Sequence, residues 1–461
     1  MDASDTTAVP NLAGPVPPAE PLPFFKAVRA ARENVMALFP RAAYEEPIWT
    51  SRALFGGATI VSDPAGVKQV LLDKVAIYPK AKMEREVLGA AFGDGLLTSD
   101  GDKWRSHRRI MAPSFDHRSI VSYAPTMTET TRAHLAQWGR WEIDIADDMT
   151  RLTLQIISRT MFSSDADELG ALVGDTLHRG QEALGFSFLD FVPLVGRWHL
   201  RWRLRRVKAT FAKLDRAMYP LIRERSSKPH ATPRDLLDRL IAARDSETGR
   251  ALTEQEIRDE VVIIFLAGHE TTALAMTYAW YLLSLHPREE AKLHAELDAV
   301  LGGRPPEYED LEKLPYTRMV IEEALRLYPP APGLSAREAA DDDEILGQRI
   351  RKGAMVVVAP WVLHHHHALW DNPNRFDPER FSPAQSAGRA RFAYLPFGAG
   401  PRICIGAALA MTEASLMLAT IAQRYRLKLV PGQDIVLQHR VTMRPRDGIK
   451  MLIERRDRGV G

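Results

Sequence analysis

The sequence has only one cysteine, Cys404, among its 461 residues, so no internal disulfide can form. Because disulfide frameworks belong to oxidising compartments, their absence predicts a cytoplasmic protein. An excess of one charge sign is also lacking, since 61 basic and 59 acidic residues leave a formal charge of +2. This balance gives no global reason to expect a nucleic-acid partner.

The N-terminal segment lacks a long apolar run. Residues 1–23 instead carry prolines at positions 10, 15, 17, 18, 21 and 23. Signal peptides and membrane anchors both need a continuous apolar stretch. We therefore expect no transmembrane anchor and an extended Pro-rich arm over 1–23. The rest, 24–461, is predicted to be one large domain, because no linker or repeat interrupts it.

Cys404 lies in the stretch Phe-Gly-Ala-Gly-Pro-Arg-Ile-Cys-Ile-Gly, at 397–406. A lone thiol can fill a core, act as a nucleophile or bind a metal. Glycines allow a sharp turn whose N–H groups point inward, and Arg402 supplies a nearby cation. An apolar helix then follows, and the dipole at its start favours a thiolate. These neighbours favour a metal ligand over a buried core cysteine.

The pattern Phe-x-x-Gly-x-Arg-x-Cys-x-Gly resembles the haem-binding loop of the cytochrome P450 family. The five matching positions are Phe397, Gly400, Arg402, Cys404 and Gly406. The resemblance implies that Cys404 is the proximal thiolate ligand of the iron of haem b. It also implies the cytochrome P450 fold, which is mainly α with small β-sheets (α+β). The haem is then expected between a long central helix and the helix after the cysteine loop.

The longest helix is predicted to begin at Thr253, where Thr253 and Glu256 form a capping box, and to end before Pro287. Its residues are apolar nearly all round, so it should run through the core. Polar residues at 268–272 interrupt the apolar run, which argues against a transmembrane span. Burying a glutamate without partners is costly, so this interruption calls for a functional explanation.

That interruption, Ala267-Gly268-x-Glu270-Thr271, resembles the oxygen-activation motif of the same family. The Thr271 hydroxyl can donate to the carbonyl of Ala267, four residues earlier. Gly268 leaves room beside the helix for O₂ and haem. The resemblance implies that Glu270 and Thr271 relay protons to the bound oxygen.

Trp104 and Arg108 are four residues apart and share a helix face. The family uses a Trp-x-x-x-Arg pair to hold one haem propionate, and Arg337 is expected to reach the second. Neighbouring cations of the same helix are expected to form a basic surface where an acidic ferredoxin or flavodoxin docks. A solvated basic turn is the alternative. These cations are Lys103, Arg105 and Arg109.

Two further patterns are predicted to be structural. Glu323 and Arg326 form a Glu-x-x-Arg pair on one helix face, and the resemblance implies that Arg380 completes a buried triad with them. The run His364–His367 looks like a metal cluster by composition. Four consecutive residues cannot all face one ion, so we favour a structural role.

Periodicity predicts helices over 24–39, 125–162 and 167–185, strands over 49–55 and 58–61, and a loop-rich stretch over 80–99. The Phe-rich segment 186–195 suggests an apolar lid, and the resemblance places the next stretch, 197–208, between two lid helices above the pocket. Cations interleave with Trp198 and Trp202 over 197–208. This composition suggests a nucleic-acid or membrane surface. A solvated basic segment with half-buried tryptophans is the preferred alternative.

The resemblance implies a haem-thiolate monooxygenase that inserts one atom of O₂ into a C–H bond of a small hydrophobic substrate. Electrons are expected from NAD(P)H through a separate ferredoxin or flavodoxin and its reductase, since no reductase domain follows Cys404. The alternatives are a peroxygenase or isomerase, or a non-catalytic haem sensor. The Glu270–Thr271 pair counts against the first two. A fatty acid, terpenoid, steroid or aromatic hydrocarbon all remain open as substrates.

Overall fold

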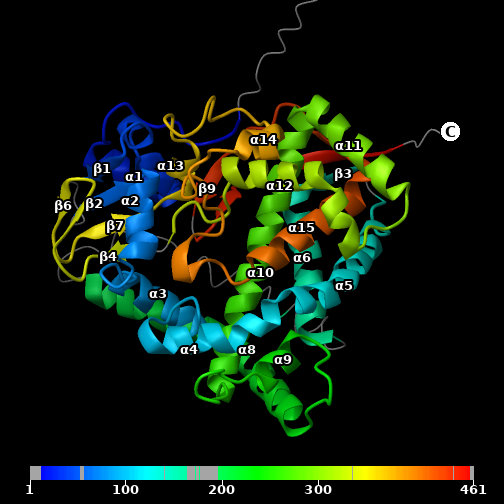
Figure 1. The fold of residues 1–461 in the computed structure, drawn as a ribbon, viewed down its shortest axis with the longest axis horizontal. Coiled ribbons are helices and arrows are strands. Elements are labelled where there is room, and N and C mark those ends of the chain that lie inside the picture. Colours follow the sequence, from blue (N-terminus) through cyan, green and yellow to red (C-terminus); the bar gives the residue numbers. More distant parts are fainter. Residues whose placement is uncertain are drawn as a thin grey trace, which may run out of the picture.

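A computed structural model describes residues 12–51, 57–139, 141–163, 172, 176, 196–334, 336–439 and 441–456. In these ranges the chain is mainly helical with small sheets, as predicted (Figure 1). The helices are α1 (Phe24–Glu33), α2 (Pro64–Lys68), α3 (Lys82–Phe92), α4 (Gly101–Met111), α5 (His117–Leu135), α6 (Ile145–Phe162), α8 (Gly196–Ser227), α9 (Leu236–Ala242), α10 (Glu254–Leu285), α11 (Pro287–Leu301), α12 (Pro315–Leu327), α13 (Pro360–His364), α14 (Pro383–Ser386) and α15 (Ala407–Ala422).

Shorter helical turns connect these helices. They are η1 (Val35–Leu38), η2 (Arg41–Tyr44), η3 (Gln69–Asp73), η4 (Ala112–Phe115), η7 (Tyr308–Lys313), η8 (Pro378–Phe381) and η9 (Gly400–Arg402). The strands are β1 (Ile48–Ser51), β2 (Ala58–Val61), β3 (Glu142–Asp144), β4 (Arg337–Glu338), β5 (Asp343–Ile345), β6 (Gln348–Ile350), β7 (Met355–Val357), β8 (Tyr425–Leu429), β9 (Leu437–His439), β10 (Met443–Pro445) and β11 (Lys450–Arg455).

The described strands form four small sheets. One sheet has the order β1-β2-β7-β4, in which β2 and β7 run parallel and pair Ala58 with Met355. A second has the order β3-β11-β8 and is antiparallel throughout. β5–β6 and β9–β10 are antiparallel pairs. Figure 1 shows the first sheet at one side of the molecule and β3 at the other, with the helices between them.

The central element is α10, which packs on α6, α12 and α15. Its N-terminus has the predicted capping box: the Thr253 hydroxyl accepts from the Glu256 N–H, and the Glu256 carboxylate accepts from the Thr253 N–H. The helix is long and apolar enough to cross a membrane, but 78% of its apolar window is buried inside the protein. It is therefore a core helix, as the sequence predicts.

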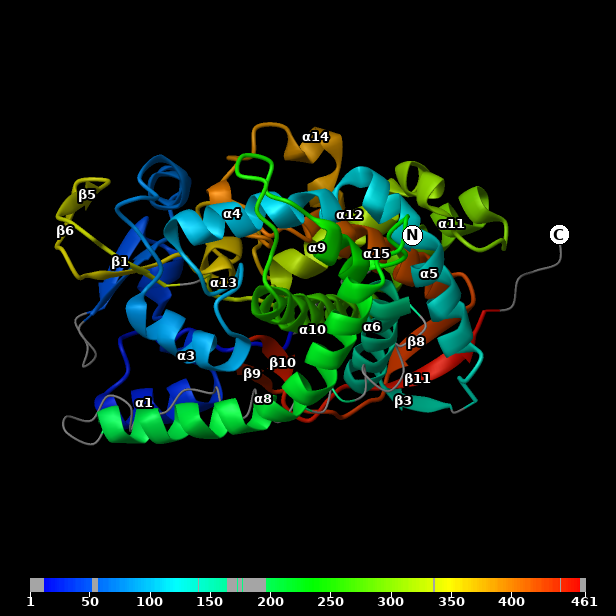
Figure 2. The ribbon, with the colours of Figure 1, turned by 90° about the horizontal axis from the view of Figure 1, so that it is seen from below.

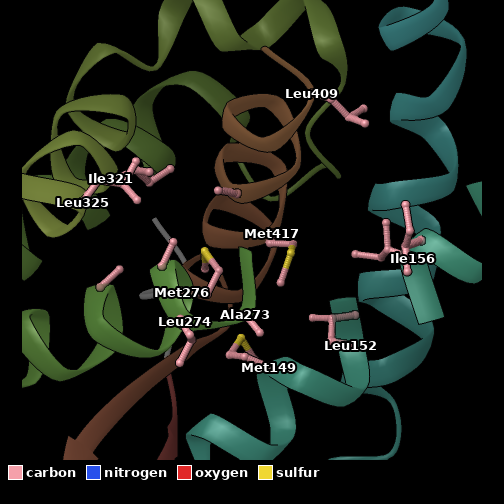
Figure 3. Packing of buried hydrophobic residues seen from close by; sticks show 14 of the residues in the cluster. Met149, Leu152, Ile156, Ala273, Leu274, Met276, Ile321, Leu325, Leu409 and Met417 are labelled. Carbon is pink, nitrogen blue, oxygen red and sulfur yellow. The ribbon is translucent and has the colours of Figure 1, made fainter. Parts of the chain in front are cut away.

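The contact between α6, α10 and α15 forms the middle of the core. Figure 3 shows Met149 and Leu152 of α6 directed toward Ala273 and Met276 of α10, with Met417 of α15 beside them. All five side chains are buried. Full burial of such side chains stabilises a fold by roughly 1.5–3 kcal/mol each for the larger ones. This packing fixes the position of α10 and of the helix that follows the cysteine loop.

The predicted helix over 24–39 is wrong in its second half, because α1 ends at Glu33. Asn34 has extended backbone, and its side-chain oxygen accepts from the Met36 N–H at 3.0 Å. Its amide also donates to the Leu437 carbonyl at 3.2 Å. Hydrogen bonds to a distant strand thus stop the helix, and a 3₁₀ turn follows it.

The predicted helix over 125–162 is in fact two helices, α5 and α6, separated by β3. Asp144 ends the strand, and its carboxylate caps α6 by accepting from the N–H of Ala146 at 3.0 Å. The stretch 80–99, predicted to be loop-rich, contains α3. That helix ends at Gly93, whose φ of 78° and contact with Asp259 leave no room for a side chain.

Other expectations fall partly or wholly outside the described residues. Those for 167–185 and 186–195 do so, apart from positions 172 and 176. The predicted strand over 49–55 is β1 as far as Ser51, and the rest is not described. The basic stretch 197–208 forms the first turns of α8 rather than a connection between helices. In the described part of the Pro-rich arm, the N–H of Ala13 donates to the Tyr281 hydroxyl at 3.1 Å.

The structure brings Glu323, Arg326 and Arg380 together, as predicted. The Arg326 guanidinium donates to both carboxylate oxygens of Glu323, at 2.6 and 2.7 Å, and Arg380 lies 3.4 Å from the same carboxylate. Arg326 also donates to the His364 carbonyl at 2.9 Å. The His364 ring accepts from the Leu395 N–H at 2.8 Å, and no described group of His, Cys, Asp and Glu could hold a metal.

Removing the buried Glu323 carboxylate should destabilise the protein strongly, because it leaves two guanidinium groups without their anion. We expect Glu323→Ala to lower the free energy of unfolding by about 3–5 kcal/mol in urea titrations. Glu379→Ala is the matched control, since the Glu379 side chain is partly exposed and pairs with Lys292 at 3.3 Å. Its expected effect is below about 0.5 kcal/mol. Equal midpoints for the two variants would contradict the role of the triad.

Candidate active site

A cavity of about 990 Å³ adjoins both α10 and the loop that carries Cys404. Its volume is at the upper end of the range of roughly 300–1,000 Å³ that ligand sites occupy. Most of the residues predicted from the sequence to form the site line it. They are Trp104, Arg108, Ala267, Gly268, Thr271, Arg337, Phe397, Arg402, Cys404 and Gly406. Glu270 and Gly400 are the predicted residues that do not.

The cysteine loop holds its thiol toward this cavity. The Cys404 N–H donates to the Phe397 carbonyl at 2.9 Å, which closes the loop. The thiol is open to the cavity although protein packs around it, and burial therefore raises its pKa. The Gly406 N–H and the charge of Arg108 act in the opposite direction. The inward N–H group is therefore that of Gly406, and the nearby cation is Arg108 rather than Arg402, the cation expected from the sequence.

Gly400 supports the loop from behind instead of lining the cavity. Its φ is 68°, a conformation that favours glycine. A side chain at this position would collide with the carbonyl of Leu71 in η3. Gly400 therefore lets the cysteine loop pack directly on the backbone of that turn.

Two predicted arginines and a tryptophan line the cavity beside the loop, and we call the cations on this side of the cavity the cationic wall. Arg402 pairs with Asp100 and donates to the Ser99 carbonyl at 3.1 Å. Its guanidinium lies 4.4 Å from the centre of the Trp104 ring. Arg108 donates to the carbonyl of Ile403 at 2.8 Å.

Arg337 and Lys80 complete this wall from the sheet side. Arg337 is buried, and its Nε and Nη1 atoms have no hydrogen-bond partner among the described residues. Burial lowers the pKa of Arg337, and the charge of Arg402 adds to this. Burial likewise lowers the pKa of Lys80 to about 8, with Arg402 the next cause. No sequence pattern marks Lys80, so sequence reasoning missed it.

The oxygen-activation segment has part of its predicted geometry. The Thr271 hydroxyl donates to the Ala267 carbonyl at 2.6 Å, the contact expected from the spacing. Gly268 lines the cavity, but a side chain there would meet Ile157 of α6 at 3.2 Å. The small residue thus lets α10 approach α6 closely as well as lining the cavity.

Glu270 is buried, but it is not among the residues that line the cavity. Its Oε1 accepts from the Thr442 hydroxyl at 2.7 Å. His269 turns to another side, where its Nδ1 lies 2.7 Å from the Phe265 carbonyl. Thr272 lines the cavity next to Thr271. The Thr442 hydroxyl therefore helps to hold the Glu270 carboxylate in place.

Two ionisable side chains in the cavity were also missed. Glu413 of α15 is fully enclosed, its Oε1 has no described partner, and burial raises its pKa to about 8. The Nδ1 of His439, at the end of β9, has no partner among the described residues, and burial lowers the pKa of this ring to about 4. Burial thus favours the neutral form of both side chains. In the sequence each looks like an ordinary helix or strand residue.

The expected basic docking surface is largely compensated by nearby acids. Lys103 lies 2.8 Å from Asp94, and Arg105 pairs with Asp102. Arg109 lies 2.9 Å from Asp245. Each of the three cations named for docking therefore has a carboxylate partner, which weakens the expectation of a strongly cationic surface here.

The chain matches the family model described as Cytochrome P450 over residues 15–453. It is 38% identical to a Streptomyces melanosporofaciens protein named cyclooctatin synthase, over 81% of each chain. It is 37% identical to cyclooctat-9-en-7-ol 5-monooxygenase of the same organism, over 82% of each chain. Pentalenene oxygenase of Streptomyces avermitilis is 35% identical, over 82% of this chain and 83% of that protein.

A solved structure agrees with these comparisons. The haem domain of cytochrome P450DA superposes with a TM-score of 0.84 at 29% identity and covers 97% of this chain and 98% of that one. The family implies haem b as cofactor, and the residues present fit it. Cys404 faces the cavity, and Arg337 has two buried donor atoms without partners, as a site for a carboxylate requires.

Arg337→Ala should weaken haem retention, because the variant loses a buried donor for a propionate. We expect haem transfer to apomyoglobin to become about tenfold faster, the effect of one charge-assisted hydrogen bond. Arg349→Ala is the control, because Arg349 is exposed and pairs with Asp342 at 2.8 Å. Identical transfer rates for wild type and Arg337→Ala would show that Arg337 holds no part of the haem.

Glu413 should make stability fall as pH rises. Its folded pKa of about 8 exceeds the ordinary value of 4.5, so the folded state keeps a proton that the unfolded state releases. The stability that this proton provides is complete below about pH 4.5 and is lost up to about pH 8. Glu413→Gln should remove a slope of up to about 1.4 kcal/mol per pH unit from urea titrations. Parallel profiles for Glu413→Gln and wild type would contradict this.

Proposed function

The chain belongs to the cytochrome P450 monooxygenases, and from this premise we propose that it hydroxylates a small hydrophobic substrate at a C–H bond. Electrons would come from NAD(P)H through a separate ferredoxin or flavodoxin and its reductase. One observation carries the proposal. A single cavity is lined both by the lone cysteine and by the Thr271 turn of the central helix.

Haem b, when bound, supplies an iron centre that activates O₂. We assign Cys404 as its ligand, since the Gly406 N–H and Arg108 favour the charged form of that sulfur. Lys80, Arg108, Arg337 and Arg402 would hold the two propionates. Trp104 would orient Arg402 through its ring, and Phe397, Ala267 and Gly268 would pack against the faces of the macrocycle. Gly406 would leave room close to the sulfur.

Thr271 would help to deliver the proton that oxygen activation consumes. Its hydroxyl donates to the Ala267 carbonyl, so its oxygen keeps two lone pairs with which to accept from a water in the cavity. Glu270 is the neighbouring buried acid and would resupply protons. Its carboxylate is positioned by Thr442, so delivery to the cavity requires a side-chain rotation or an intervening water.

The substrate would be apolar, because the cavity beyond the cationic wall is. Aliphatic side chains of α1, α3 and α10 line that part, among them Val28, Val87, Ile263 and Ala275. Two relatives are named for cyclooctat-9-en-7-ol and pentalenene. We propose a compact cyclic hydrocarbon, and a fatty acid as second choice.

The test is NADPH-driven turnover of the holoprotein with a surrogate ferredoxin and reductase. Probe compounds are pentalenene and lauric acid. We expect hydroxylated product from wild type. Thr271→Ala should form at least about tenfold less product while still consuming NADPH and releasing hydrogen peroxide. Thr271→Ser, which keeps the hydroxyl, is the control.

Three results would overturn this proposal. The first is a Thr271→Ala variant that couples NADPH to product as well as wild type does. The second is a reduced wild-type protein that shows no red-shifted Soret band with carbon monoxide, and the third is such a band in Cys404→Ala. A protein that gives the band but never turns over any probe with the reductase pair would be a sensor instead.

A further inference from the structure

The first turns of α8 carry cations and exposed indoles together. Over 197–208 the sequence has six arginines or lysines and no acidic residue. Trp198 is 75% exposed and Trp202 is 53% exposed, so the expectation of half-buried tryptophans is wrong for Trp198. The Arg206 guanidinium lies 4.8 Å from the centre of the Trp202 ring. Large exposed aromatics are costly in water and mark interaction surfaces.

Other elements at the same side of the molecule add apolar side chains. Phe25 of α1 is 84% exposed, and Met83 of α3 is 42% exposed. Figure 2 shows α1 and α8 running along the same lower edge, and α3 packs on α8. We call the set Phe25, Met83, Trp198 and Trp202, with the cations of 201–208, the entry surface.

The cavity reaches this surface. Leu200 and Arg203 of α8 line it, as do Phe24 and Ala27 of α1. Met83 both lines the cavity and is exposed, so the cavity opens between these helices. Trp198 and Trp202 lie within two residues of the lining positions of α8, and Phe25 follows Phe24, so the exposed aromatics lie close to the mouth through which a substrate would pass.

We propose that the entry surface binds peripherally to an anionic lipid bilayer. Tryptophan prefers the interface between headgroups and hydrocarbon, and arginine is attracted to anionic headgroups. An acidic protein or a nucleic acid would use the cations but would leave Phe25, Met83 and Trp198 in water. A bilayer uses both, and it is also the phase in which an apolar substrate dissolves.

This inference deepens the proposed function, because it rests on a hydrophobic substrate that enters between α1 and α8. In the proposed arrangement no helix spans the bilayer. The contact would be shallow, with the indoles at headgroup depth and the cavity mouth facing the hydrocarbon. Substrate could then move from lipid to cavity without crossing water.

The experiment is co-sedimentation of the full-length holoprotein with phosphatidylcholine vesicles that contain about one third phosphatidylglycerol. We expect binding that is lost in about 1 M salt and absent from pure phosphatidylcholine. The double variant Trp198→Ser/Trp202→Ser and the double variant Arg201→Glu/Arg205→Glu should each bind about tenfold more weakly. A blue shift of tryptophan emission on binding should disappear in the first.

Trp141→Ser is the matched control. Trp141 is 84% exposed but precedes β3, at the opposite end of the molecule from α1 (Figure 2). This variant should bind vesicles like wild type. The carbon monoxide spectrum checks that each variant is folded, and if a double variant fails it, Trp198→Ser alone replaces it.

Several outcomes would overturn the proposal. These are no binding to the anionic vesicles, equal weakening by Trp141→Ser, or loss of binding on charge reversal alone with the tryptophan variant unaffected. The last would point to an acidic protein or nucleic acid. Vesicle binding without any turnover would refute the proposed function and leave the entry surface standing, so the two failures are distinguishable.

Discussion

The constraint on which the rest of the structure depends is that α10 must carry polar side chains through an apolar core. Several of them bond to a group of another element or to a carbonyl one turn back. Thr271 donates to Ala267, and Glu270 accepts from Thr442. The carbonyl of His269 accepts from Thr153 of α6 at 2.9 Å. Because buried polar groups are costly without partners, these bonds fix which face of α10 meets α6 and which meets the cavity.

A second constraint comes from the cations that are buried along one side of the cavity. Burial lowers the pKa of Lys80 and of Arg337, the charge of Arg402 lowers both further, and Asp100 and Glu84 compensate only part of that effect. Cations clustered in a buried wall are unfavourable unless an anion joins them. The thiol of Cys404, by contrast, needs a cationic partner to ionise. One cofactor with carboxylates at its edge and a metal at its centre satisfies both demands, which is why the site residues fit haem as a set.

Sequence reasoning succeeded where the signal is local. The capping box of α10, the Thr271–Ala267 contact and the Glu323–Arg326 pair all follow from spacing along one helix. It failed where distant partners decide. Asn34 ends α1 because Leu437, some 400 residues later, accepts its amide. The β3 break between α5 and α6 depends on pairing with β11. The fold brings three residues into one cavity that no local sequence pattern marks as part of a site. They are Lys80, Glu413 and His439.

The position of the cavity mouth changes what can select the substrate. When an apolar molecule moves from water into the cavity, its burial lowers the free energy in proportion to its area, whatever its shape. A molecule that leaves a bilayer gains little from burial alone, because both phases are apolar. Entry through the surface around Trp198 and Phe25 therefore shifts discrimination to close packing against the aliphatic lining and to the few polar atoms there. Burial lowers the pKa of His439 to about 4, which favours the neutral ring, and its Nδ1 has no partner among the described residues. The His439 ring can hydrogen-bond a hydroxyl or carbonyl on the substrate. A substrate without such a group leaves the buried nitrogen without a partner, and this cost disfavours its binding.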